Sequence, residues 1–306
     1  MLARSLYKLS NPIRKFSTDL IKPKVTCLFH NDTNTATYIA SCPETGKCAI
    51  IDPVLDYDQV GHRVTTIHAD SVIAEVTKNH LEPVYILETH VHADHLTGAK
   101  ILKNAFPSAQ TAIGFNVTAV QVQFSRLFNL SNFRTDGSQF DKLIKDGESF
   151  SIGKLNLKAF WSPGHTPACM VYTVGDAVFS GDTLFMPDFG TARCDFPGGS
   201  ADVLYQSIKK LFELPDEYRV FVGHDYGTEK RGVAWESTMG EEKRNNKHLN
   251  LSTSRDAFVQ WRKERDGTLK LPKLIMESLL VNLRNGELPE PEANGISYFK
   301  LPINAL

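Results

Sequence analysis

Three imidazoles and one carboxylate lie within six consecutive positions of this chain. His90, His92, Asp94 and His95 follow an apolar run, residues 84–88, that we expect to form a buried strand. These side chains cannot all be core residues, because each would need its own buried polar partner. Neutral imidazole nitrogen and carboxylate oxygen are the ligands that a borderline divalent metal prefers. The spacing therefore predicts a metal site on the loop that leaves this strand.

Three further side chains of the same types each follow another expected strand, close to a glycine or a proline. His165, Asp182 and His224 come after apolar runs that end at residues 160, 180 and 222. Each of them alone is equally consistent with a turn residue. Four strand ends that carry His or Asp indicate instead that the strands deliver these side chains to one site.

The elements that must position these side chains are short. Apolar runs bounded by turn residues predict strands at residues 25–30, 36–42, 48–52, 84–88, 150–152, 155–160, 170–174, 177–180 and 219–222. Helical spacing predicts helices near residues 72–81, 97–106 and 200–213, the last with Ser200 as its N-cap. Residues 113–146 are interpreted as an insertion, or as a helix with a long loop. Two runs of strands, each followed by helices, favour an α/β protein with a four-layer αββα sandwich over a doubly wound sheet.

Composition excludes several classes of protein. The 306 residues suffice for one large domain with an appendage, and 42% of them are hydrophobic. The net charge of −1 gives no indication of a nucleic-acid partner. No apolar run approaches the ~20 residues that would span a membrane. We therefore expect the protein to bind neither nucleic acid nor a membrane. Five cysteines without a CxxC pair indicate neither a disulfide framework nor a thiolate zinc site. A reducing compartment is the simplest interpretation.

The first residues differ from the rest of the chain. Four basic residues precede the first acidic one, Asp19, with serines and leucines between them. This composition is typical of a mitochondrial transit peptide, and residues 14–17 (RKFS) resemble a matrix-processing site. We therefore predict a transit peptide at residues 1–16 and a location in the mitochondrial matrix. The alternative is an ordinary basic N-terminus.

The motifs taken together resemble those of the metallo-β-lactamase superfamily, which includes glyoxalase II. They are, in order, HxHxDH, PGHTP, GD and a final HDY after a strand. The resemblance covers residues 25–230 and implies a metallo-β-lactamase-fold catalytic domain at residues 17–230. Residues 231–306 then form a C-terminal helical extension packed on that domain.

Within the superfamily, four stretches are similar to the persulfide dioxygenases, also called sulfur dioxygenases. They are residues 49–55 (AIIDPVL), 88–98 (ETHVHADHLTG), 162–169 (SPGHTPAC) and 193–196 (RCDF). That family holds one Fe(II) per chain, and the positions that match its ligands are His90, His165 and Asp182. Two histidines and one carboxylate leave coordination positions open, as non-haem iron enzymes that activate O₂ require.

The same resemblance implies the substrates, glutathione persulfide and O₂, which give sulfite and glutathione in the catabolism of hydrogen sulfide. Arg193 matches the glutathione-contacting arginine of the family, although it could instead be an ion-pair partner at the surface. Thr166 flanks a ligand, and we expect Tyr226 to hydrogen-bond the substrate or a metal-bound species during catalysis. The groups left to orient the ligands or accept protons are His92, Asp94, His95 and His224.

The ligand types alone leave a second function open, a binuclear zinc hydrolase of the glyoxalase II type. One Zn(II) would be held by His90, His92 and His165 and the other by Asp94, His95 and His224, with Asp182 bridging the two. A bridging hydroxide would then attack a thioester. The match around the ligands favours the dioxygenase. A non-catalytic scaffold is disfavoured because no ligand position is lost, and a nuclease because the chain has no basic stripe.

The extension at residues 231–306 resembles that of the longer β-lactamase-hydrolase-like proteins. Residues 258–269 predict a packing helix, and the closing residues 296–306 are apolar enough to dock on the domain. We expect the extension to act in a homodimer or as a lid. The chain departs from the compact family pattern at Cys194, where a threonine is more usual, and at residues 114–146, which are longer than expected.

Overall fold

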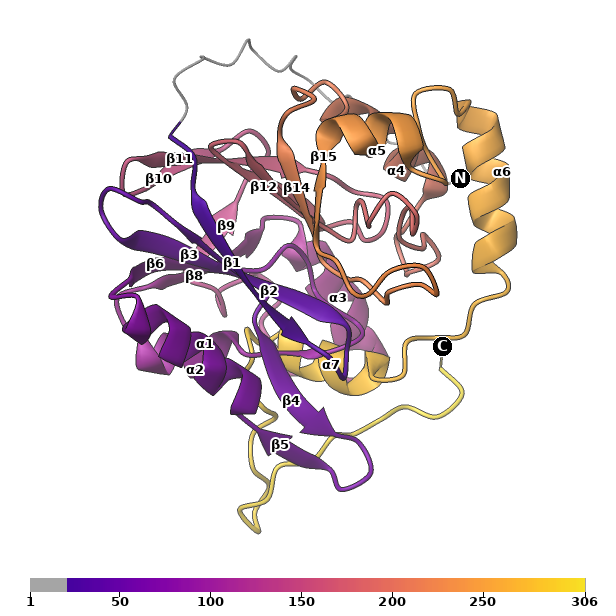
Figure 1. Cartoon of the computed structure of the whole chain (residues 1–306). Helices are drawn as coiled ribbons and strands as arrows, with labels where there is room; N and C mark the ends of the chain where they lie inside the picture. Colours follow the sequence, from indigo (N-terminus) through magenta and orange to yellow (C-terminus); the bar gives the residue numbers. More distant parts are fainter. Residues whose placement is uncertain (1–20, 306) are drawn as a thin grey trace.

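Two six-stranded sheets pack face to face, with helices on both outer faces (Figure 1). This computed structural model describes residues 21–305, so the transit peptide predicted at residues 1–16 lies outside the described residues. The helices are α1 (Ile67–Lys78), α2 (Ala99–Ala105), α3 (Val117–Leu127), α4 (Ala201–Leu211), α5 (Met239–Asn245), α6 (Arg255–Asp266) and α7 (Ile275–Asn282). In this part of the chain no helix has the length and apolar character needed to cross a membrane.

The first sheet combines an antiparallel half with a parallel half. Its strands, in spatial order, are β1 (Lys24–His30), β2 (Thr35–Ser41), β3 (Lys47–Ile51), β6 (Glu82–Leu87), β8 (Gln110–Gly114) and β9 (Lys142–Ile144). β1, β2 and β3 are antiparallel, whereas β3, β6, β8 and β9 run parallel. A smaller sheet joins β5 (Arg63–Thr65), β4 (Val54–Asp58) and β7 (Leu96–Thr97). The strands predicted as β1, β2, β3 and β6 are confirmed, with ends shifted by one or two residues.

The second sheet begins as an antiparallel meander. Its strands are β10 (Ser149–Ile152), β11 (Leu155–Trp161), β12 (Met170–Val174), β13 (Ala177–Gly181), β14 (Arg219–Val222) and β15 (Glu236–Thr238). β14 pairs with β13 in parallel, so the chain must cross over between them, and α4 makes this crossover. The Ser200 hydroxyl caps α4 by accepting a hydrogen bond from the Val203 amide, as predicted.

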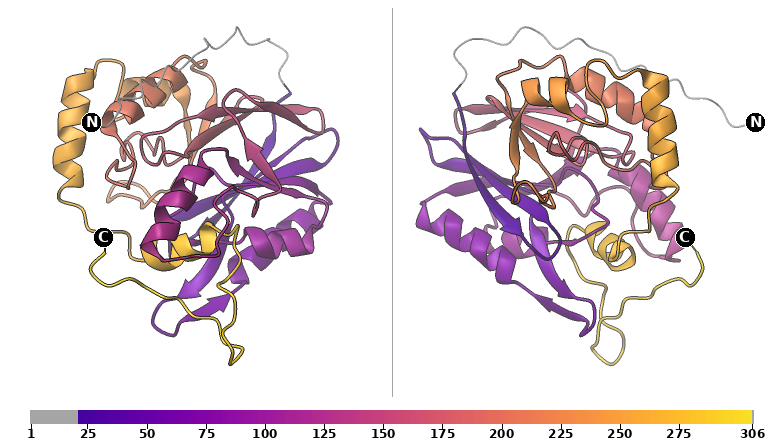
Figure 2. Two further views of the ribbon diagram at one scale, coloured as in Figure 1. Left: turned by 180° about the vertical axis from the view of Figure 1, so that it is seen from behind. Right: turned by 45° about the vertical axis from the view of Figure 1, so that its right-hand side comes forward.

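Apolar side chains fill all three interfaces between the layers. The space between the sheets is packed with residues that include Tyr38, Ile51, Leu157, Tyr172 and Phe179. α1 and α2 cover the outer face of the first sheet, and α4 with α6 covers the outer face of the second (Figures 1 and 2). This arrangement confirms the predicted four-layer αββα sandwich.

Two regions differ from the expectations. Residues 113–146 contain the helix α3 but also the strand β9, which is only three residues long and has no distinct sequence pattern. The extension contacts two separate parts of the fold. α6 packs on α4, which covers the second sheet, whereas α7 packs against β7 of the smaller sheet. The chain beyond α7 then runs as an extended segment along the outside of the molecule (Figure 2). Ile296, Leu301 and Ile303 are exposed there, so the expectation that they dock on the domain is wrong for these side chains.

Candidate metal centre

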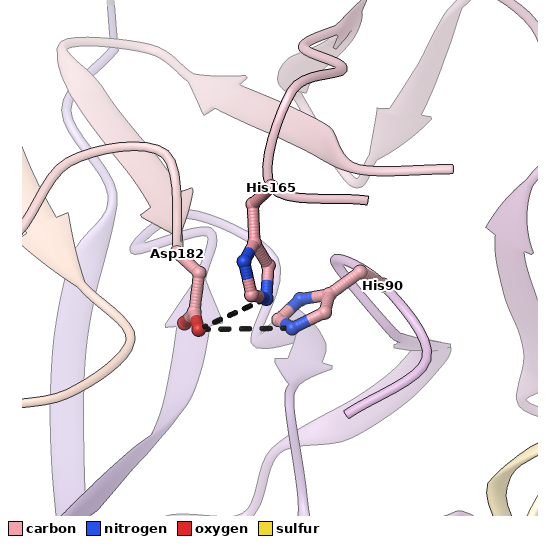
Figure 3. A group of neighbouring side chains, drawn as sticks. All are labelled: His90, His165 and Asp182. Carbon is pink, nitrogen blue, oxygen red and sulfur yellow. Dashed lines mark ion pairs between the residues drawn. The ribbon is translucent and has the colours of Figure 1, made fainter. Parts of the chain in front are cut away.

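The strand ends that the sequence singles out meet at one edge of the sandwich. β11 and β13 are both antiparallel to β12, and β14 is parallel to β13, so β11, β13 and β14 end at the same edge of the second sheet. The loop that follows β6 of the first sheet carries His90 to this edge. Figure 3 shows that His90, His165 and Asp182 come from three separate loops and point toward one another.

These three residues form a buried group. Asp182 Oδ2 lies 3.5 Å from His165 Nε2 and 3.8 Å from His90 Nε2. One ligand atom from each residue lies within 4.8 Å of the others. Ligand atoms about 2.1 Å from one ion are roughly 3–4 Å apart, so the spacing suits a single divalent metal.

Hydrogen bonds on the far side of each ring determine which nitrogen faces the centre. His165 Nδ1 donates to the Arg193 carbonyl at 2.8 Å, and His90 Nδ1 donates to Thr89 Oγ1 at 3.0 Å. The Thr89 hydroxyl gives its own proton to Asp52 Oδ2 at 2.8 Å, so it accepts from His90. Each Nε2 therefore presents a lone pair to the centre, as a metal-bound imidazole does.

The unpaired atoms at the centre also fit a metal ion. Within residues 21–305, the buried His90 Nε2 and Asp182 Oδ1 make no hydrogen bond. Burial and the neighbouring imidazoles hold the pKa of His90 well below its usual range, so this ring is neutral at neutral pH. Buried polar atoms without a partner are costly, and a divalent cation would satisfy both the imidazole lone pair and the carboxylate.

A second group of ligand types adjoins the first. His92, Asp94 and His224 also place one ligand atom each within 4.8 Å of one another. His224 Nε2 lies 3.4 Å from Asp94 Oδ2 and 3.3 Å from Asp182 Oδ1, so Asp182 stands between the two groups. Burial would lower the pKa of His224, but Asp94 and Asp182 outweigh it and raise the pKa. His95 belongs to neither three-residue group, and its Nδ1 donates to the Leu96 carbonyl at 3.1 Å.

Two buried carboxylates that the sequence analysis did not assign hold His92 from the other side. His92 Nε2 donates to Asp52 Oδ1 at 3.0 Å and lies 3.4 Å from Glu88 Oε2. Burial raises the pKa of Glu88 to about 7. The pKa of Asp52 is lowered, because the attraction of His92 and the hydrogen bonds of Thr89 outweigh its burial. Asp52 follows an apolar run, as the candidate ligands do. This position in the sequence could have identified it as a residue of the site.

The guanidinium group of Arg193 makes hydrogen bonds to other residues of the chain. Nε and Nη2 donate to the two carboxylate oxygens of Asp195 at 2.5 Å and 2.6 Å, and Nη1 donates to the Lys270 carbonyl at 2.6 Å. The structure therefore contains the ion pair that the sequence analysis gave as the alternative role of Arg193. Its side chain still lines the cavity described below, and its carbonyl orients His165.

The other two expected substrate contacts lie in different surroundings. Thr166 is buried, and its hydroxyl lies 3.1 Å from Cys169 Sγ, so it is turned away from the cavity lining. Tyr226 is about half-exposed and lines the cavity. Its ring stacks on that of His224, with 6.5 Å between the ring centroids, and lies beside that of Phe189, with 5.1 Å between the centroids.

A cavity of about 1120 Å³ opens onto the candidate ligands, and His165, Asp182, Asp94, His95 and His224 are part of its lining. The C-terminal extension contributes a wall that sequence reasoning missed. Lys247, Arg265 and Lys273 lie in this wall, and within the described chain none of them forms an ion pair with a carboxylate. We call these three residues the basic wall. Asp32, Asp56 and Asp58 line another part of the same cavity.

Comparison with known proteins places these features in a family. The family described as "Metallo-beta-lactamase superfamily" matches residues 32–224. "Glyoxylase B2" of Dictyostelium discoideum is 50% identical over 287 residues, which cover 93% of this chain and 98% of that protein. A "Beta-lactamase hydrolase-like protein" of Agrobacterium fabrum is 49% identical over 93% of this chain, which spans 65% of that protein's length.

Persulfide dioxygenases are among the homologues as well. The human protein named "Persulfide dioxygenase ETHE1, mitochondrial" is 32% identical over 249 residues, which cover 80% of this chain and 81% of that protein. The crystal structure of ETHE1 from Myxococcus xanthus superposes with a TM-score of 0.69 at 29% identity, covering 86% of this chain and all of that one. The match over residues 32–224 includes every candidate metal ligand. The chain therefore belongs to the metallo-β-lactamase superfamily, a superfamily of metal-binding enzymes, and persulfide dioxygenases are among its homologues.

Proposed function

We propose that this chain is an iron-dependent persulfide dioxygenase with one Fe(II) held by His90, His165 and Asp182. Glutathione persulfide, one O₂ and one water would give glutathione and sulfurous acid, which ionises to sulfite. The S–S bond breaks, the outer sulfur gains three oxygen atoms, and the inner sulfur leaves as the thiol. O₂ is the oxidant that accepts the electrons from the outer sulfur.

One observation carries this proposal. Two imidazoles and one carboxylate converge with their ligand atoms within 4.8 Å, and two of the three residues, His165 and Asp182, also line the cavity. Substrate and O₂ would therefore reach the metal from the cavity. The three protein ligands would leave the coordination positions on that side open. Fe(II) bound at such a two-histidine, one-carboxylate site supplies the open positions at which O₂ and a sulfur ligand react.

The cavity suits a small anionic thiol compound. Glutathione persulfide carries two carboxylates and one ammonium group at neutral pH. The basic wall offers cations without carboxylate partners among residues 21–305, and Asp32 and Asp58 offer carboxylates to the ammonium group. Phe185, Phe189 and Leu269 also line the cavity and offer apolar contacts to the aliphatic part of the substrate.

The remaining candidate residues act on the substrate or on the ligands in this proposal. Tyr226 would hydrogen-bond the persulfide, since it lines the cavity beside His224. Arg193 would orient His165 through its carbonyl and hold the cavity wall through Asp195. Thr166, whose side chain is buried, would support the loop that carries His165. The groups left to orient ligands or accept protons are His92, Asp94, His95 and His224.

A second candidate function has its own supporting observation. Asp182 of the first group places its Oδ1 3.3 Å from Nε2 of His224, a member of the second group, and a carboxylate between two metals would be needed in a binuclear centre. Two Zn(II) ions there would support the hydrolysis of a glutathione thioester. The relatives named "Glyoxylase B2" and "Beta-lactamase hydrolase-like protein" are consistent with this alternative.

O₂ uptake on addition of glutathione persulfide distinguishes the two candidates. The dioxygenase consumes O₂ and forms sulfite, and His90→Ala removes both. Hydrolysis of a glutathione thioester in the absence of O₂ uptake would favour the zinc enzyme instead. The same preparation should be assayed for both reactions, because the two share their candidate ligands.

The cellular location also belongs to the proposal. We propose the mitochondrial matrix, on the basis of the basic N-terminal segment and the word "mitochondrial" in the name of the human relative. Imaging of the full chain with a C-terminal fluorescent tag, compared with a chain that lacks residues 1–16, tests this location. Cytosolic fluorescence of both chains would contradict it.

A further inference from the structure

We infer that helix α7 of the C-terminal extension positions the metal-binding loop, and that Asn282 is the residue through which it does so. The inference rests on the metal site proposed above. It gives the extension a role at the metal centre that is separate from the lid or dimer role expected from its sequence.

Asn282 joins the extension to the loop that carries the candidate ligands. Its Nδ2 donates to the carbonyl of His92 and to the carbonyl of His95, both at 2.8 Å. Its Oδ1 accepts from the Thr97 amide at 2.8 Å. The amide group therefore uses both donor hydrogens on the loop and its acceptor on β7, which directly follows the loop, and the residue is only 4% exposed. A buried amide with all its partners on the loop and the strand after it holds the loop in one conformation.

The loop itself is divided between the metal centre and α7. His90, His92 and Asp94 belong to the candidate metal groups, whereas the alternate residues Val91 and Ala93 pack in an apolar cluster with α7. The cluster includes Ile275, Leu279 and Leu280 of α7, and Leu283 directly after the helix. Because Val91 and Ala93 alternate with the candidate ligands in the chain, the contact that orders these two residues also restrains the ligands between them.

A polar connection continues from Asn282 to His92. Thr97 donates its backbone amide to Asn282 and its hydroxyl to Glu88 Oε1. Glu88 Oε2 lies 3.4 Å from His92 Nε2. Asn282 thus contacts the loop backbone directly and reaches the ring of His92 through two buried side chains.

The chain just after the helix is held by separate contacts, which supply a matched control. Asn285, just beyond α7, is also buried, and its Nδ2 donates to Thr111 Oγ1 at 2.9 Å and to the Gln139 carbonyl at 3.0 Å. These partners are outside the metal-binding loop. Asn285 has a positive φ of 56°, so Asn285→Ala loses two buried hydrogen bonds and adds backbone strain.

The test measures binding of Co(II) alone to the metal-free full chain, by titration and by its visible absorption spectrum. Asn282→Ala, Asn282→Ser and Asn285→Ala are compared with the natural sequence, and thermal unfolding of each metal-free protein is recorded. We expect the Asn282 variants to bind Co(II) roughly 10–100-fold more weakly, the usual effect of removing a group that orients ligands, and with a changed spectrum. Asn285→Ala should retain the natural affinity and spectrum despite its lower stability.

Two results would overturn the inference. One is natural Co(II) affinity and spectrum in the Asn282 variants; the other is an equal loss of affinity in Asn285→Ala, which would assign the effect to general destabilisation. If Asn282→Ala does not fold, Asn282→Ser, which keeps one hydroxyl donor, provides the same comparison. Failure of the unmodified chain to bind Co(II) would instead contradict the metal site of the proposed function, and the inference with it.

Discussion

His92 Nε2 donates a hydrogen bond to Asp52 Oδ1 at 3.0 Å, and both side chains are buried. Asp52 lies between β3 and β4 with a positive φ of 50°, a conformation that few residues adopt without strain. The same carboxylate accepts from the Thr89 amide at 2.7 Å and from the Thr89 hydroxyl at 2.8 Å. One carboxylate therefore fixes the start of the metal-binding loop and directs Nδ1 of His92 toward the other ligands.

Removal of this carboxylate should destabilise the fold. Asp52→Ala leaves His92 and Thr89 without their acceptor in the interior, and such a loss costs roughly 3–5 kcal/mol in the free energy of unfolding. Urea denaturation of the metal-free protein measures it. Asp32→Ala, at an exposed carboxylate of the same cavity, should change the free energy by less than about 0.5 kcal/mol. Equal stabilities of the two variants would contradict this assignment.

Single substitutions of the ligands should separate the one-metal and two-metal accounts. In the iron account, Asp182→Ala and His165→Ala abolish metal binding, whereas His224→Ala retains one metal per chain. Elemental analysis after anaerobic loading measures this directly. If the natural chain holds two metals and His224→Ala holds one, the second group binds a metal and the binuclear account is favoured.

The basic wall should determine substrate affinity. Lys247→Ala, Arg265→Ala and Lys273→Ala should each raise KM for glutathione persulfide up to about fivefold with little change in kcat, because an exposed ion pair contributes roughly 0.2–1 kcal/mol. The effects should shrink at high salt. Lys263→Ala is the matched control, since Lys263 is exposed on α6 but is absent from the cavity lining. Unchanged KM in all three variants would show that the substrate binds elsewhere.

Stability should also fall in mild acid, through a histidine outside the metal centre. Burial and the nearby His30 lower the pKa of His68 from 6.5 to about 4, although Asp56 opposes the shift. The unfolded chain therefore binds this proton more readily, so the contribution of neutral His68 is fully present above pH 6.5 and is lost as the pH falls to about 4.

Urea denaturation at a series of pH values checks this expectation. His68→Gln should flatten the pH dependence of the free energy of unfolding between pH 6.5 and 4. A variant curve parallel to that of the natural chain would rule out His68 as the cause.

The candidate ligands could be predicted from the sequence because their signals are local. Each lies within a few residues of the end of a strand, and strands of four to seven residues such as β6, β11 and β14 have clear apolar patterns. Parallel and antiparallel pairing then brings these ends together without further information. The four-layer architecture follows from the same patterns.

The features that the sequence did not reveal depend on contacts between distant residues. Asn282 is 185 positions from Thr97, and no local pattern relates the two. The basic wall forms only because α6 and the segments before and after it contribute to the cavity lining. The Arg193 side chain is engaged by Asp195, two residues away, and only the rotamers decide whether that pair forms or both face solvent.

The most direct test of the account combines metal content and O₂ uptake in one anaerobically purified sample of the full chain. The account predicts one iron per chain and, on addition of glutathione persulfide, one O₂ consumed for each sulfite formed, with both lost in Asp182→Ala. Two zinc ions per chain, no O₂ uptake and hydrolysis of a glutathione thioester would contradict it.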